Sequence, residues 1–215
     1  MSTLHIAVVD VGSPKQSNLG WAIGNSQSTI INKGDDLAEF VKKIDNLLKN
    51  HPVALGFECP LFVPSGLDWK TLTNARRGEC DHRGNRPWSA SAGACSMATG
   101  LVQASYVLRH LKNIKKISLD WQPLPANHGE LLVFEAFVSG QGKPTNVDGK
   151  NGSHQEDATY AVKEFCNRID NQHIESDVTL ENGCDCLSII GAILLHAGVS
   201  KDVSLLHKKV LVIKT

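Results

Sequence analysis

Three apolar runs in this chain each end in a single acidic residue, and these acids are the first candidates for chemistry. They are Asp10 after residues 6–9, Glu58 after residues 53–57, and Glu135 after residues 131–134. Continuous apolar runs of this length are typical of strands buried on both faces, as in a parallel sheet covered by helices. Ligands of such sheets bind at the carboxyl ends of the strands. If the three strands lie side by side, their carboxylates converge on one shallow site.

Two further acids are candidates to complete this group. Asp185 opens an apolar stretch, residues 184–198, that predicts the last helix, and Asp157 lies in the first turn of the helix predicted after Ser153. The sequence leaves open which of the two joins the cluster. Each acid also has a structural interpretation, because an acid at a strand end is solvated and an acid in a first helical turn stabilises the helix dipole.

A cluster of carboxylates has a chemical consequence. Like charges held close together repel one another, so a proton or a divalent cation has to compensate them. Oxygen ligands favour Mg²⁺ or Mn²⁺. In phosphoryl transfer, two such cations held on rigid elements activate water and stabilise the leaving oxygen. On this interpretation Asp10, Glu58 and Asp185 bind metal, and Glu135 completes the catalytic group.

His154 is a further candidate for proton chemistry. It lies beside the apolar face of a helix whose start is indicated by Ser153 and Glu156, which fit a capping box. A histidine at this position could shuttle protons, because its charge changes near neutral pH. A structural histidine with satisfied hydrogen bonds is the alternative.

Basic residues and tryptophans are interleaved in the segment 60–96. Its members are Arg76, Arg77, Arg83 and Arg86, which lie between Trp69 and Trp88. Arginines interleaved with aromatic rings can bind phosphates and stack bases, so the four arginines and Trp88 are predicted to contact a nucleic-acid substrate. Acids in the same segment offer the alternative of a solvated, salt-bridged loop.

The elements that must position these residues follow from the periodicity of the apolar side chains. Strands are predicted at residues 4–11, 19–25, 28–32, 53–58, 131–137 and 209–213, and helices at 37–48, 96–116, 153–169 and 184–198. This order predicts an α/β fold in a single domain spanning 1–215. A long irregular insertion is predicted at 60–96 and a flexible loop at 139–152.

The composition limits the kinds of partner. The chain has 22 basic and 22 acidic residues, so any nucleic-acid contact must come from a local patch. No run approaches the roughly 18 apolar residues of a membrane span. The amino terminus does not read as a signal peptide, and the six cysteines share no framework spacing. A cytoplasmic protein without membrane contact is expected.

The order of strands and acids resembles the ribonuclease H-like superfamily, and within it the predicted-nuclease family called domain of unknown function 429. The similar stretches are residues 8–12 with 20–22, residues 56–61, residues 133–137, and residues 185–187 leading into the last helix. The resemblance implies a mixed central sheet whose first three strands are antiparallel and whose later strands are parallel. It also implies helices on both faces and a metal-dependent carboxylate site.

The resemblance assigns positions to the acids as well. Asp10 is similar to the first-strand aspartate, Glu58 to the fourth-strand acid, Glu135 to an acid of the fifth strand, and Asp185 to the acid of the final helix. Two departures stand out. The fourth-strand acid of that group is often an aspartate, and its final helix often carries paired aspartates where this chain has Asp185 alone. The second departure weakens the expectation of a full two-metal site.

Together these observations predict a Mg²⁺- or Mn²⁺-dependent nuclease that hydrolyses phosphodiester bonds. One alternative is a non-catalytic module on the same fold that binds nucleic acid or protein. Another is an actin-like or sugar-kinase-like ATPase, in which a strand ending in Asp-x-Gly also occurs, although such proteins need two lobes and a second phosphate loop. The sequence does not choose between DNA and RNA.

Overall fold

The computed structural model describes residues 3–27, 29–66, 68–81, 84–138, 153–172 and 174–215. Its strands are β1 (His5–Asp10), β2 (Gly20–Asn25), β3 (Ile30–Gly34), β4 (Val53–Phe57), β5 (Phe62–Ser65), β6 (Cys80–Asp81), β7 (Gly84–Asn85), β8 (Lys116–Ser118), β9 (Glu130–Phe137), β10 (Asp185–Ser188) and β11 (Val212–Lys214). Its α-helices are α1 (Leu37–Leu48), α2 (Ser91–His110), α3 (His154–Asp170) and α4 (Ile189–His196), and short 3-10 turns lie at Pro14–Gln16 and Val203–His207.

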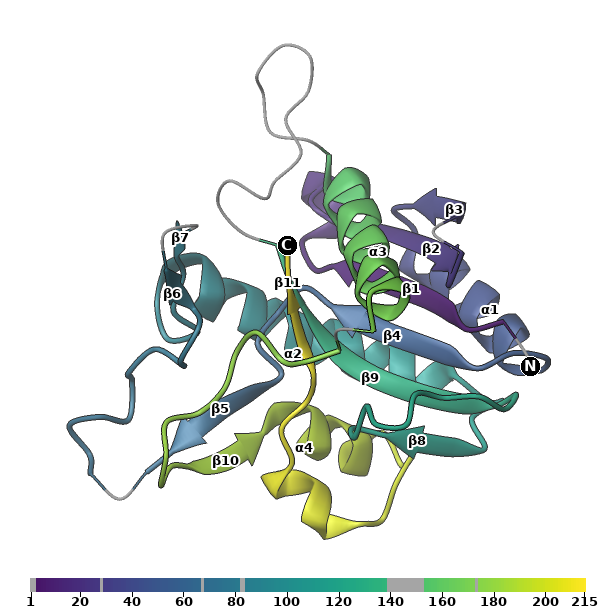
Figure 1. Ribbon diagram of the computed structural model, residues 1–215. Helices are drawn as coiled ribbons and strands as arrows, with labels where there is room; N and C mark the ends of the chain where they lie inside the picture. The colour runs from purple at the N-terminus through teal and green to yellow at the C-terminus, as the bar shows by residue number, and fades with distance from the viewer. Residues whose placement is uncertain (1–2, 28, 67, 82–83, 139–152, 173) are drawn as a thin grey trace.

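One mixed sheet forms the centre of the molecule (Figure 1). Its strands lie in the order β11, β9, β4, β1, β2, β3, and β8 pairs with the first half of β9. Strand β2 is antiparallel to both of its neighbours, β1 and β3, whereas β4, β9 and β11 run parallel to β1. The predicted α/β class and the change from antiparallel to parallel pairing are therefore confirmed.

Both faces of this sheet are buried, as the apolar strands require. In β1, Ala7 and Val9 point into one core with α1, α2 and α4, while Ile6 and Val8 point into the other core with α3. Figure 1 shows α3 over one face and α2 behind the other. Successive side chains of a strand point to opposite faces, so an uninterrupted apolar run matches this arrangement.

The second helix is displaced from its predicted range of 96–116. It begins at Ser91 and ends at His110, and Leu111 is already extended. The carboxylate of Asp45 accepts hydrogen bonds from the backbone N–H of Lys112 at 2.6 Å and of Asn113 at 2.9 Å. These contacts replace the helical bonds that the two N–H groups would otherwise make, so the helix ends there.

The predicted helix at 184–198 is also corrected. Residues 185–188 form strand β10, which pairs with β5, and α4 follows at Ile189. Exposed Asp185 and Leu187 alternate with buried Cys186 and Ser188, which is the two-residue period of a strand. The Ser188 hydroxyl then accepts a hydrogen bond from the backbone of Gly191 and caps the helix.

The segment 60–96 is more ordered than an irregular insertion, because it contains β5, β6, β7 and the first turn of α2. The loop predicted at 139–152 lies outside the described residues. No disulfide joins the six cysteines. In the part of the chain that the structure describes, no helix is both long enough and apolar enough to traverse a bilayer.

Candidate functional site

The strand register brings three of the predicted acids to one end of the sheet. Asp10 ends β1, and Glu58 follows β4 with its backbone N–H donating to the Val9 carbonyl at 2.8 Å. On the next strand, Glu135 pairs in register with Phe57. The three acids therefore come from neighbouring parallel strands at their carboxyl ends, where the apolar runs predict them.

The first turn of α3 adds two more side chains beside Asp10. Gly20, which pairs with Asp10 across β1 and β2, lies directly under the start of this helix. A Cβ atom at Gly20 would come within 2.3 Å of the His154 carbonyl carbon and 2.4 Å of the Gln155 nitrogen. The close approach of helix to strand therefore requires glycine at this position. It places His154 and Asp157 next to Asp10.

The close contact at Gly20 predicts that even a methyl side chain at this position destabilises the fold. Gly20→Ala should lower the free energy of unfolding by about 1–3 kcal/mol, because backbone atoms of α3 must shift to admit the methyl group. Urea denaturation measures the effect. Gly66→Ala is the matched control, since among the described residues its Cβ would meet one atom within 4 Å, the Thr71 hydroxyl oxygen at 3.9 Å. Equal stability of the two variants would contradict the assigned packing of α3.

Asp10, His154 and Asp157 form a group that could hold a metal ion. One ligand atom of each residue lies within 4.8 Å of the ligand atoms of the other two. Asp10 and Asp157 are buried, and the Nδ1 atom of His154 contacts Oδ2 of Asp10 at 2.5 Å. Buried carboxylates this close together are costly unless a proton, a cation or a histidinium compensates them. The capping box of Ser153 and Glu156 is confirmed and fixes the start of α3.

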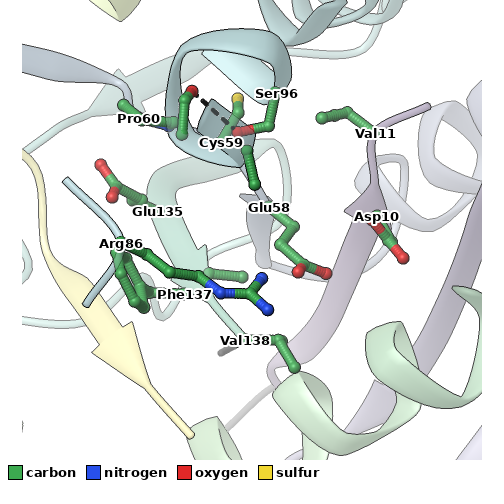
Figure 2. Close-up of a pocket in the computed structure, with 13 residues that line it drawn as sticks. Asp10, Val11, Glu58, Cys59, Pro60, Arg86, Ser96, Glu135, Phe137 and Val138 are labelled. Carbon is green, nitrogen blue, oxygen red and sulfur yellow. Dashed lines mark hydrogen bonds between the residues drawn. The ribbon is translucent and has the colours of Figure 1, made fainter. Parts of the chain in front are cut away.

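A small hollow adjoins this group. It has a volume of about 180 Å³, and its lining includes Asp10, Glu58, Glu135 and Arg86. Figure 2 shows the Arg86 guanidinium directed towards the carboxylate of Glu58. Sites for drug-sized ligands usually measure about 300–1,000 Å³. This hollow therefore suits a single charged group such as a phosphate, with the rest of a ligand outside.

Helix α2 closes the back of the hollow. The side chain of Gln103 donates to the carbonyl of Gly12 and accepts from its N–H, which fixes the backbone just after Asp10. Gly100 allows close contact with Cys59, whose sulfur would lie 2.2 Å from an added Cβ. Burial, together with the charges of Glu135 and Glu58, raises the pKa of the Cys59 thiol well above its usual value. Cys59 is therefore protonated and unsuited to nucleophilic chemistry.

Glu135 has a different set of contacts from the other acids. Its two oxygens accept hydrogen bonds from the Arg76 guanidinium at 2.6 and 2.8 Å, and one also accepts from the Leu61 backbone at 2.9 Å. The Nε atom of Arg76 forms a second ion pair, with Oε1 of Glu79 at 2.8 Å. All three charged side chains are fully buried. Glu135 lines the hollow, but its charge is directed at Arg76.

Arg76 is thus not placed to hold substrate, contrary to the sequence-based expectation. Burial lowers the pKa of its guanidinium, but the attraction of Glu135 and Glu79 outweighs this effect and raises that pKa above its ordinary value. Its Nη1 atom also donates to the Phe62 carbonyl at 3.1 Å. The carboxylate of Glu79 also accepts a hydrogen bond from the backbone N–H of Trp88 at 3.1 Å. The contacts of Arg76 therefore fix the segment that bears Arg86, and this segment places Arg86 in the lining of the hollow.

The remaining predicted residues lie elsewhere. Asp185 is exposed on β10, outside the hollow and outside the group around Asp10, so Asp157 is the acid that the structure places beside Asp10. Arg77 is exposed, and its backbone pairs with Thr179. The indole of Trp88 donates to the Asn74 carbonyl at 2.9 Å. Arg83 lies outside the described residues.

Gln103 and Glu79 are the site residues that the sequence interpretation missed. Glu79 follows Arg76 by three positions, a spacing that places two side chains on the same side of a tight turn. Gln103 is a lone long polar side chain within the apolar stretch of α2, which is a weak signal. Comparison of the chain with family models, with curated proteins and with solved structures finds no match. Its function must therefore be argued from the site.

Proposed function

We propose that this protein is a divalent-metal-dependent nuclease with its metal site at Asp10, His154 and Asp157. The observation that carries the proposal is the convergence of these three side chains at the carboxyl end of β1, beside the hollow lined by Glu58 and Arg86. The order of strands and the position of the acids also support membership of the ribonuclease H-like superfamily.

The donor set bears on the choice of metal. Carboxylates suit Mg²⁺ and Mn²⁺ equally, whereas an imidazole nitrogen is an uncommon ligand for Mg²⁺ and a common one for transition metals. Asp10, His154 and Asp157 would therefore hold Mn²⁺ in preference to Mg²⁺, with Glu58 beside them. When bound, such an ion supplies Lewis-acid polarisation of a phosphoryl oxygen and a water of lowered pKa.

The residues of the chain supply the rest of the site. Arg86 offers a cationic partner for the negative phosphate, and Glu58 lies opposite it as an acceptor for a proton from attacking water. The hollow admits one phosphate group and not a whole nucleotide, which favours a phosphodiester in a chain over a free nucleotide. This size also argues against the ATPase alternative. Nucleic acid is accordingly the proposed substrate, of either DNA or RNA.

Metal titration tests the site and shows whether Asp157 or Asp185 contributes to metal binding. Calorimetry with Mn²⁺ and Mg²⁺ should show binding to the wild-type protein, tighter for Mn²⁺, and at least a tenfold loss of Mn²⁺ affinity in Asp157→Asn. Asp185→Asn is the matched control, because it removes the same charge from the exposed acid and should bind as the wild type does. Binding lost in Asp185→Asn and kept in Asp157→Asn would overturn the assignment. No binding by the wild-type protein would favour the non-catalytic module.

A further inference from the structure

Five basic side chains gather at the end of the sheet opposite the candidate metal site. They are Lys49, Arg109, Lys112, Lys115 and Lys116, and all five are exposed. They come from the end of α1, the last turn of α2, the connection that follows it, and the start of β8 (Figure 1). These five residues are called the basic surface. The chain as a whole has no net charge, so this concentration is local.

The basic surface contains two neighbouring hollows. One hollow of about 340 Å³ has Arg109, Lys115 and Lys116 in its lining. A second hollow of about 280 Å³ has Lys49, Lys112 and Lys115 in its lining. Ile114 and Lys115 line both hollows, so the two hollows are neighbours and the five cations lie around them.

The backbone under these cations is held in place. The carboxylate of Asp45 accepts hydrogen bonds from the backbone of Lys112 and from both the backbone and the side chain of Asn113. Farther along, the backbone N–H groups of Lys115 and Lys116 donate to the Gly129 carbonyl at 2.8 and 3.2 Å. The nearest acid of α1 is therefore engaged with backbone, and the lysines project from a fixed segment.

Few carboxylates neutralise these cations. Among the described residues, Arg109, Lys112 and Lys115 form no ion pair, and Arg109 instead meets the imidazole Nε2 of His196 at 3.0 Å. Lys116 lies 3.8 Å from Glu130. The carboxylate of Glu130 accepts hydrogen bonds from Ala126 and Asn127, which lower its pKa to about 2 and keep it ionised, so Lys116 is the one cation of the basic surface that a described carboxylate pairs with.

We propose that the basic surface binds the phosphate backbone of a nucleic acid, independently of any metal at Asp10. Cations spread around two neighbouring hollows match the repeated charges of a polymer better than those of a single small anion. A membrane surface is disfavoured, because amphipathic membrane-binding faces combine exposed apolar side chains with their cations. The large exposed apolar residues of the described chain do not include any residue that lines the two hollows.

The position of the basic surface implies a length requirement. Strand β9 runs from Glu130, beside the basic surface, to Phe137, beside the candidate metal site. Its eight residues span about 26 Å at roughly 3.3 Å per residue. A nucleic acid must therefore exceed this length to contact both ends.

The test uses a labelled duplex of about 12 base pairs, with EDTA present so that no metal site contributes. Anisotropy titrations over a range of salt concentrations give the slope of log K against log salt. The variant Lys112→Gln/Lys115→Gln removes two phosphate contacts. It should reduce that slope by about 1.8 and lower the affinity near 0.1 M salt by a factor of roughly several tens. Arg109→Gln, as a second variant, should reduce the slope by about 0.9.

The control removes two exposed lysines from elsewhere, in Lys33→Gln/Lys163→Gln, and should leave the slope unchanged. An equal loss in this control, an unchanged slope in Lys112→Gln/Lys115→Gln, or no duplex binding by the wild-type protein would each overturn the proposal. Binding to anionic lipid vesicles but not to the duplex would overturn it as well. The duplex titrations are made in EDTA and the metal titrations without nucleic acid, so failure of the metal assignment is distinguishable from failure of this proposal.

Discussion

Asp10→Asn should reduce phosphodiester cleavage on the order of 10³-fold while leaving the fold intact. The aspartate lies at the end of β1 and contacts His154, and its proposed role is to share a metal ion with Asp157. An asparagine keeps the shape and one oxygen but removes the charge that binds the cation. Losing the stabilisation that a metal gives to a phosphoryl transition state costs several kcal/mol, and each 1.4 kcal/mol is about tenfold in rate.

The measurement is Mn²⁺-dependent hydrolysis of labelled DNA and RNA, single- and double-stranded, by wild type and variant. Urea denaturation of both proteins checks that the variant is folded. Asp170→Asn is the matched control, since this exposed aspartate ends the same helix that carries His154 and Asp157. Cleavage by Asp10→Asn at the wild-type rate would remove Asp10 from the mechanism. Metal binding without cleavage of any substrate by the wild-type protein would favour the binding module.

Arg76→Met should destabilise the protein by about 3–5 kcal/mol, because it leaves the carboxylates of Glu79 and Glu135 buried without their cation. The guanidinium also donates to the Phe62 carbonyl and lies 4.6 Å from the centre of the Phe62 ring. All these partners are buried, so solvent does not replace the lost contacts. The loss should appear as a lower urea midpoint.

Two comparisons make this prediction specific. Arg77→Met removes the neighbouring arginine, which is exposed, and should change stability by no more than about 0.5 kcal/mol. The triple variant Arg76→Met/Glu79→Gln/Glu135→Leu removes the whole buried ion network and should recover part of the lost stability, since a replaced ion network costs less than a broken one. Equal midpoints for Arg76→Met and Arg77→Met would show that the network does not stabilise the fold.

The acids at strand ends were predictable from local pattern. An apolar run followed by an acid specifies both a buried strand and the place where its polarity changes, and neighbouring strands then align the acids of β1, β4 and β9. The capping box at Ser153 was predictable for the same reason, because its two residues lie within one helical turn. The composition and strand order likewise sufficed for the α/β class.

The composition of the site was decided by tertiary contacts. His154 meets Asp10 across 144 positions of sequence, and no local pattern encodes a contact at that separation. Asp157 and Asp185 both follow a polar stretch and precede apolar residues, yet the approach of α3 over Gly20 places Asp157 beside Asp10. Asp185 instead lies on an exposed edge, because the alternation of Cys186 and Ser188 makes that stretch a strand.

The arginines show the same division. Their charge and spacing predict contact with phosphate, but a sequence does not state which arginine is buried. Arg76 meets Glu135 across 59 positions and becomes an internal anchor, while Arg86 reaches the hollow. The sequence by itself determined the central strands β1, β4 and β9 and the acids at their ends, because these depend on residues close together in the chain. The neutral overall charge follows from composition alone. The tertiary structure alone decided which carboxylates share the site and which charged side chains form buried ion pairs with one another. The reason is that burial and pairing are set by segments far apart in the sequence.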